Sequence, residues 1–142
     1  MPTRSRFIPL AAITVCSALL AACVATPDDV AQLDANRALD QRSSRGLVEA
    51  TVALDNPQLA RGPNDFSIAL RAAKGASSPV LTSVDASMVV HGHHASASNI
   101  LSDGEIFRAV GLDLFMSGRW QIALGVELDD TSDLVEFALD VP

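Results

Sequence analysis

The chain has 142 residues, with 17 acidic and 10 basic side chains and a formal net charge of −7. This length allows one domain of ordinary size. An acidic surface repels phosphate backbones, because nucleic-acid binding depends on their neutralisation by Lys and Arg, so nucleic acid is excluded as a partner.

The N-terminus has the pattern of a secretory signal peptide. Arg4 and Arg6 precede an apolar run over residues 7–22, which ends in small residues before Cys23. The run is shorter than the roughly 20 apolar residues that a transmembrane helix needs. Its end, LAAC, resembles the lipobox of bacterial lipoproteins, in which the cysteine becomes the lipidated first residue. We therefore expect a signal peptide over 1–22, lipidation at Cys23 and attachment to a membrane through a lipid anchor.

The residues after this junction refine the expected location. Val24 stands where many lipoproteins retained in the inner membrane have aspartate, which favours the outer membrane, with the domain facing the periplasm. Cys16 leaves with the signal peptide and Cys23 carries lipid, so we expect no internal disulfide and no thiolate site. The alternative is an ordinary signal peptide followed by an incidental cysteine.

Residues 23–45 are polar and rich in alanine, without a bulky apolar run. They predict a lipidated cysteine followed by a flexible tether. The alternative is a short helix that Asp28 and Asp29 cap and that extends through Leu33 and Leu39.

From Gly46 the hydrophobic pattern changes to a period of two. Strict alternation of apolar and polar residues indicates half-buried strands, and turn residues such as Asn-Pro, Gly-Pro and Asp-Gly separate the alternating runs. Gly111 interrupts the run over 105–115, where a bulge is expected. Residues 46–142 therefore predict an all-β fold, an antiparallel β-sandwich of about seven strands. The alternating runs cover residues 48–55, 66–71, 83–91, 105–115, 120–128 and 135–141.

Three stretches of this domain resemble the YtkA-like family of exported domains and, more distantly, FixH-like proteins. They are RGPNDF at residues 61–66, MVVHGHH at 88–94, and DGEIF at 103–107 followed by SGRW at 117–120. Val89 departs from the proline that the family often has there, and Phe107 replaces the more usual tyrosine one residue late. The resemblance implies an immunoglobulin-like sandwich and points to copper handling.

All three histidines fall within four positions, at His91, His93 and His94. If the strand continues through residue 91, His91 and His93 face outward together, with Met88 on the core face. Two imidazoles at this spacing suit copper, zinc or nickel, with His94 or Met88 as a third ligand if Gly92 distorts the backbone. The alternatives are a solvated strand end for the histidines and simple core filling for Met88.

The remaining candidates favour structural roles. Trp120 begins an alternating run and is expected in the core. Asp129, Asp130 and Asp133 lack the spacing of a calcium loop and indicate a solvated hairpin turn, and no catalytic motif accompanies the serines near the histidines. We therefore expect a non-enzymatic, lipid-anchored envelope domain that binds copper or zinc, or alternatively a structural module that docks an envelope protein.

Overall fold

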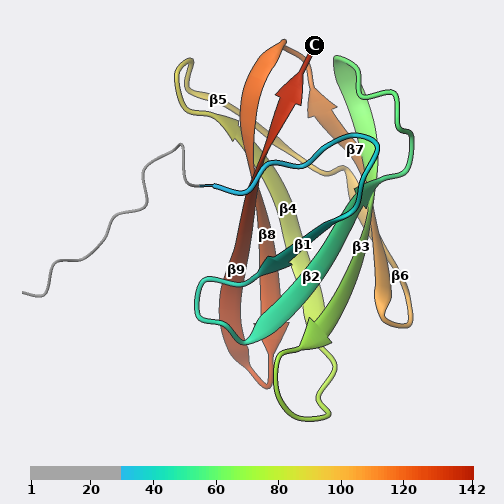
Figure 1. Cartoon of the computed structure of the whole chain (residues 1–142), viewed down its shortest axis with the longest axis vertical. Coiled ribbons are helices and arrows are strands. Elements are labelled where there is room, and N and C mark those ends of the chain that lie inside the picture. The colour runs from blue at the N-terminus through green and yellow to red at the C-terminus, as the bar shows by residue number, and fades with distance from the viewer. Residues whose placement is uncertain (1–29) are drawn as a thin grey trace, which may run out of the picture.

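The computed structural model of the chain describes residues 30–142, so the predicted signal peptide and Cys23 lie outside the described residues. Within this range the chain is all-β, and two antiparallel sheets pack face to face (Figure 1). The β-sandwich expected from the alternating sequence is confirmed. No helix within residues 30–142 has the length and apolar character needed to cross a membrane.

Within residues 30–142, nine strands form the two sheets, where the sequence pattern predicts about seven. They are β1 (Leu39–Arg42), β2 (Val48–Leu54), β3 (Gly62–Ala72), β4 (Val80–Met88), β5 (His93–Ser96), β6 (Asn99–Asp103), β7 (Ile106–Leu114), β8 (Gly118–Leu128) and β9 (Thr131–Val141). One sheet has the order β1-β2-β3-β7-β6 and the other β5-β4-β8-β9. With β2 as strand A, these contain the A-B-E-D and C′-C-F-G sheets of an immunoglobulin fold, to which β1 adds an outer strand.

The core lies between the sheets and is built from alternate residues of the long strands. On β8, every second side chain from Trp120 to Val126 is buried, and the side chains between them are partly exposed. Because successive residues of a strand point to opposite faces, this alternation places one face of each sheet in the core. The largest fully buried side chains are Trp120, Phe66, Phe137, Ile68, Leu112 and Leu114.

A bulge in β7 lies at Gly111, as the sequence predicts. The pairing between β3 and β7 shifts between Asn64 and Phe66, and the backbone amide of Gly111 donates to Oδ1 of Asp65 at 2.8 Å. Gly111 has a φ of 69°, a left-handed conformation that glycine adopts without the steric cost of a Cβ atom. A Cβ atom there would also lie 2.7 Å from Oγ of Ser98, so the fold requires glycine at this position.

The alternation of apolar and polar residues does not identify strands β5 and β6, because both lie at sheet edges. Each pairs with one neighbour only, β5 with β4 and β6 with β7. Their side chains are exposed or half-buried, so no alternation of buried residues marks them. The chain passes directly from β5 to β6 and thereby changes sheets.

The described part of the predicted tether belongs to the sandwich. Leu33 is only 2% exposed; its amide donates to the carbonyl of Ala138 at 2.8 Å, and the amide of Ala138 donates to the carbonyl of Ala31 at 2.7 Å. The flexible-tether prediction is therefore wrong from residue 30 onward, and the domain begins before Gly46. The alternative helix is wrong for the described residues as well, since the range contains β1 instead.

A buried carboxylate holds the turn between β1 and β2 against β9. Asp133 is 8% exposed and accepts hydrogen bonds from the backbone amides of Arg45 at 3.0 Å, Leu47 at 3.4 Å and Leu134 at 2.8 Å. Burial acts to raise the pKa of Asp133, but the hydrogen bonds from Ser43 and from these amides together lower it below its ordinary value of 3.8. The network stabilises the ionised carboxylate inside the fold.

The solvated turn predicted for three aspartates therefore contains only two of them. Asp129 and Asp130 form the exposed turn between β8 and β9, with φ values of 48° and 60°. Asp133 lies two residues into β9 and points inward. The prediction was wrong for Asp133 because its backbone partners, in the turn before β2, come from a distant part of the sequence.

Candidate functional site

The histidines lie where β4 and β5 join in a hairpin. β4 ends at Met88, the chain turns over residues 89–92, and β5 begins at His93. The backbone amides of His91 and Gly92 both donate to the carbonyl of Met88, at 3.1 and 2.9 Å. Gly92 has a φ of 65°, which glycine adopts readily, so this residue permits the reversal.

The hairpin changes which side chains share a face. Met88 pairs with His93, and Ser87 pairs with His94. Directly opposed residues of antiparallel strands project to the same side, with Cβ atoms about 4.5–5.5 Å apart. Met88 and His93 therefore share the core-facing side, and His94 lies on the outer side. The expectation that His93 faces away from Met88 is wrong, because the strand ends at Met88 instead of continuing to His91.

A row of rings leads from the surface into the core. The ring centroids of His91 and His93 are 6.2 Å apart, those of His93 and Phe115 are 5.3 Å apart, and those of Phe115 and Trp120 are 5.4 Å apart. The last two contacts are edge-to-face, the arrangement that aromatic pairs prefer. Trp120 is fully buried, as expected, and its Nε1 donates to the carbonyl of Met116 at 2.9 Å.

This arrangement offers two imidazoles and one thioether to an ion. His91 is exposed and His93 is half-buried, so a ring nitrogen of each can turn toward an ion at the about 2.0–2.1 Å typical of metal–imidazole bonds. Met88 is 3% exposed, and its Cε lies 3.3 Å from where a Cβ atom on Gly118 would be. Among residues 30–142, no three His, Cys, Asp or Glu side chains are grouped closely enough to hold a metal.

The same contacts also agree with purely structural roles for His93 and Met88. His93 covers the edge of Phe115, and Met88 belongs to the buried core. The ring of His91 has no such packing partner besides His93 among the described aromatic contacts. The packing of the core therefore accounts for the position of His93 but not for that of His91.

The sequence pattern places Val89 on the outer face, as observed, but it misses the exposure of Val90 in the turn. Val89 is 71% exposed and Val90 is 87% exposed, although alternation places Val90 in the core. Two adjacent valines directly before His-Gly interrupt the period of two, and this interruption is the signal that marks the turn. Both valines border a hollow open to solvent that is lined by Val30, Ser87, Val89, Val90, Arg119, Trp120, Gln121 and Ala138.

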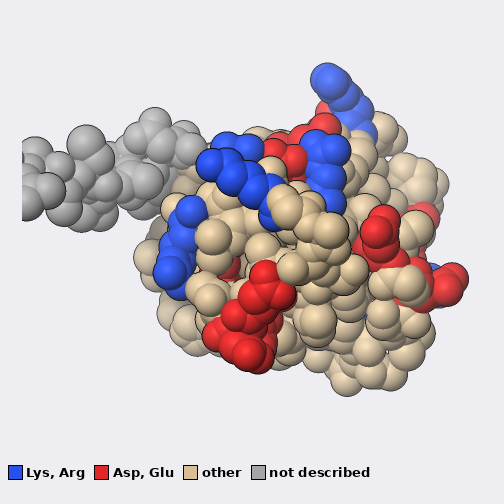
Figure 2. Space-filling model, turned by 90° about the horizontal axis from the view of Figure 1, so that it is seen from below, with Lys and Arg blue, Asp and Glu red and all other residues tan. Residues whose placement is uncertain are grey.

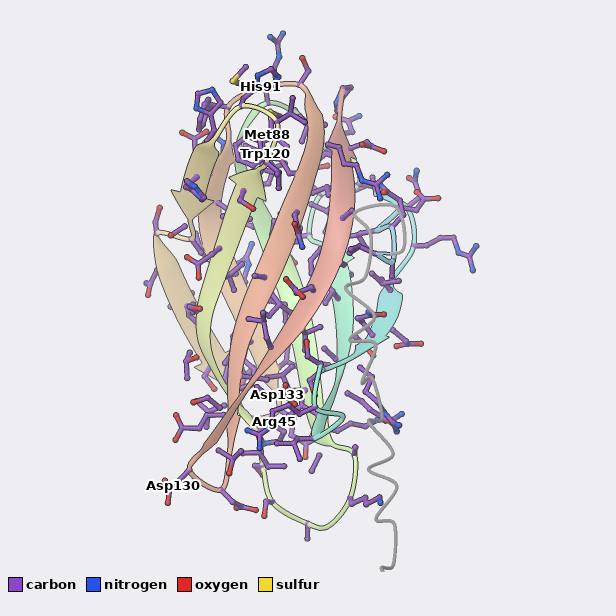
Figure 3. The ribbon with its side chains drawn as sticks, turned by 90° about the vertical axis from the view of Figure 1, so that its left-hand side faces the viewer. Arg45, Met88, His91, Trp120, Asp130 and Asp133 are labelled. Carbon is purple, nitrogen blue, oxygen red and sulfur yellow. The ribbon has the colours of Figure 1, made fainter. Side chains whose placement is uncertain are left out.

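The candidate site lies at one end of the sandwich. His91, Met88 and Trp120 lie at one end, and Arg45, Asp130 and Asp133 lie at the other (Figure 3). Lys, Arg, Asp and Glu side chains surround this second end (Figure 2). The histidine site is therefore separated from the charged end by the length of the sandwich.

A charged cluster on β1, β2 and β3 is internally paired. Arg42 and Arg71 each lie 2.7 Å from a carboxylate oxygen of Glu49. The hydrogen bond from Arg42 and the charge of Arg71 lower the pKa of Glu49 below its ordinary value. These charges satisfy one another at an exposed site, so they form a weaker candidate for binding than the histidines.

The serines near the histidines have other hydrogen-bond acceptors. The hydroxyl of Ser96 donates to Asp85 at 2.6 Å, and the hydroxyl of Ser98 donates to the carbonyl of Gly111 at 3.2 Å. Both serines thus have contacts that belong to the sheet framework. No family model, curated protein or solved structure matches the chain.

Proposed function

We propose that this chain is a non-catalytic, lipid-anchored domain of the bacterial cell envelope that binds a transition metal at the turn between β4 and β5. The observation that carries the proposal is the pairing of His91 and His93, whose ring centroids are 6.2 Å apart at an exposed turn. Neutral imidazole is a good ligand for copper and zinc. The resemblance of residues 88–94 to the YtkA-like family makes copper the first ion to test.

The two oxidation states of copper use different parts of this site. Copper(I) accepts soft thioether ligands together with imidazole, and Met88 shares the face of His93. Methionine has a flexible side chain, so its sulfur can turn toward an ion held by His93. Copper(II) prefers nitrogen and oxygen ligands, so its binding depends on His91 and His93 alone.

The proposed anchor keeps this domain close to a membrane. Cys23 precedes Val30, the first described residue, by seven positions. An extended chain spans at most about 3.3–3.6 Å per residue, so the sandwich begins within about 25 Å of the lipid. A site held at this distance suits exchange of an ion with other envelope proteins.

Copper titration of the purified chain tests the metal proposal. We expect His91→Ala and His93→Ala each to weaken copper binding by about tenfold or more, since each removes one of two imidazoles. Met88→Leu should reduce retention of copper(I) and leave copper(II) binding unchanged. Isothermal calorimetry for copper(II), and competition with a chromophoric chelator for copper(I), measure these affinities.

His94→Ala is the matched control, because His94 neighbours His93 on β5 but lies on the opposite face. Its copper affinity should equal that of the wild type. Binding should also weaken as the pH falls, because protons compete with the metal for imidazole nitrogen. Equal copper affinity of the wild type and the His91→Ala/His93→Ala double variant would contradict the proposal.

A second candidate function is a docking module for an envelope protein. The exposure of Val89 and Val90, 71% and 87%, favours it, since adjacent exposed apolar side chains often mark contact surfaces. Replacing both valines with serine should then abolish co-purification of a partner from cross-linked envelope while copper affinity is retained. Loss of the partner in His91→Ala instead would connect it to the metal site.

A further inference from the structure

We infer that a second copy of this chain completes the metal site, so that one zinc ion is held between two β4–β5 turns by His91 and His93 of each copy. This inference rests on the proposed function and specifies how the same site binds an ion that prefers four ligands. It assigns the exposed turn as an interface between two copies of the chain.

The first step is the shortage of ligands within one copy. Zinc in closed protein sites takes four ligands from cysteine, histidine and carboxylate side chains. Residues 30–142 contain no suitable group of even three such side chains, and the thioether of Met88 is not among the usual zinc ligands. His91 and His93 therefore leave two coordination positions open, which two imidazoles of another copy can fill.

The second step is access to the turn. Figure 3 shows His91 at the extreme end of the sandwich, and Val89, Val90 and His91 are all exposed. An approaching molecule therefore reaches His91 directly, and the half-buried His93 lies beside it, with the two ring centroids 6.2 Å apart. Two copies related by a twofold axis present the same surface to each other, with the ion on the axis.

The third step is charge. The segment from Ala86 to Ser102 contains no Asp, Glu, Lys or Arg, although the chain carries 17 acidic residues and a net charge of −7. Two such molecules repel each other over most of their surfaces, but the turn itself contributes no carboxylate, and Asp85, which accepts a hydrogen bond from Ser96, lies at the end of the β4–β5 pairing away from the turn. The positive charge of the ion adds attraction at the point of contact.

The fourth step is the size of the contact. Val89 and Val90 give each turn a small apolar surface that the partner's turn covers. Stable interfaces without a metal bury at least about 1,200 Å², far more than two pairs of valines provide. The dimer should therefore depend on the ion and dissociate when the ion is removed.

Sedimentation velocity of the chain from Val24 to Pro142, which contains every described strand, tests the inference. Zinc sulfate should double the mass of the wild-type protein, reaching a plateau at one zinc per two chains, and excess EDTA should restore the monomer. His91→Ala should remain monomeric with zinc. His94→Ala, the matched control on the outer face, should dimerise like the wild type.

Val90→Asp separates the interface from the ligands. It keeps both imidazoles and changes an exposed residue, so the fold is retained, but it places two carboxylates opposite each other in the dimer. We expect loss of the zinc-dependent dimer with the far-ultraviolet circular dichroism spectrum unchanged. Dimerisation of Val90→Asp at the same zinc concentration as the wild type would contradict the assigned surface.

Other outcomes distinguish a failure of the zinc-dependent dimer from a failure of the proposed metal binding. One zinc per chain without an increase in mass overturns the dimer and leaves the metal-binding proposal standing. A dimer that resists EDTA, or that forms equally in His91→Ala, overturns the role of the ion. A wild-type chain that binds neither zinc nor copper overturns both proposals.

Discussion

The buried carboxylate of Asp133 connects the turn before β2 to the last strand. It accepts three backbone amides and is 8% exposed. An amide that loses its acceptor inside a protein costs about 1–3 kcal/mol. Asp133 is therefore important for stability even though it is far from the candidate metal site (Figure 3).

Asp133→Ala should lower the free energy of unfolding by about 2–3 kcal/mol, because the amides of Arg45 and Leu47 lose their shared acceptor. Urea denaturation at pH 7 measures this change. Asp130→Asn, in the exposed turn between β8 and β9, is the control and should change stability by less than about 0.5 kcal/mol.

The contribution of Asp133 to the pH dependence of stability follows from the direction of its pKa shift. The folded pKa of Asp133 is lowered below its ordinary value of 3.8, so its stabilisation is fully present above that value and is lost as the pH falls through the lower folded value. The wild type should therefore lose more stability than Asp133→Asn in this acidic range. If the free energies of unfolding of the two proteins fall equally as the pH is lowered, folding does not stabilise the ionised carboxylate.

The histidine site shows which residue-level predictions succeed from sequence. The location of the three histidines and the burial of Met88 follow from spacing and alternation. The predicted orientation of His93 was wrong, because one hairpin at residues 89–92 reverses the chain and places His93 beside Met88. The turn that ends β4 contains Gly92 at a φ of 65°. Alternation of apolar and polar residues alone does not locate the end of this strand.

At the scale of elements, the N-terminal segment acts as part of the sandwich edge. Ala31 and Leu33 hydrogen-bond with Ala138 of β9, and the amide of Ser44 donates to the carbonyl of Leu134 further along the same strand, at 2.7 Å. An unpaired edge strand is a site for unwanted pairing with other chains. Residues 31–44 therefore protect the outer edge of β9.

Leu33→Ala should lower the free energy of unfolding by about 2–5 kcal/mol, the range for leucine truncation in a packed core. Leu101→Ala is the control, because Leu101 is 49% exposed on β6 and should change stability by less than about 0.5 kcal/mol. Chemical denaturation of the chain from Val24 compares them. Similar stabilities for the two variants would restore the tether interpretation of this segment.

Long and short strands differed in how well the sequence predicted them. The apolar residues of β2, β3, β8 and β9 alternate over enough positions to identify both the strand and its buried face. β1, β5 and β6 have four or five residues at sheet edges, where few side chains are buried. Their pairing is fixed by neighbours distant in sequence, so local pattern carries little information about them.

At the scale of the whole molecule, the histidines and the turn at Asp130 lie at opposite ends of the sandwich. One end carries the histidines and the exposed valines of the turn, and the other is surrounded by charged side chains (Figures 2 and 3). The proposed anchor at Cys23 joins the domain through the few residues before Val30. The proposed attachment would therefore restrict the distance of the domain from the lipid, while the candidate metal site lies on an exposed turn.

Cys23→Ser should release the protein from the membrane fraction, because the mature chain then has no residue to carry lipid. Labelling with palmitate followed by fractionation measures this, and the wild type should carry the label and remain with membranes. Cys16→Ser is the control, since Cys16 lies within the predicted signal peptide, and it should behave like the wild type. A wild-type protein that is exported without label would refute lipid anchoring.

The hydrogen bonds between Ala31–Leu33 and Ala138 join the first and last segments of the described chain. The side chains of Gln32 and Asp140, which are 108 positions apart, hydrogen-bond at 3.2 Å across the same junction. A chain that leaves a translocation channel N-terminus first cannot make these contacts until its final strand has emerged. Under the export that we propose, this edge of the sandwich therefore forms only after β9 has crossed the membrane.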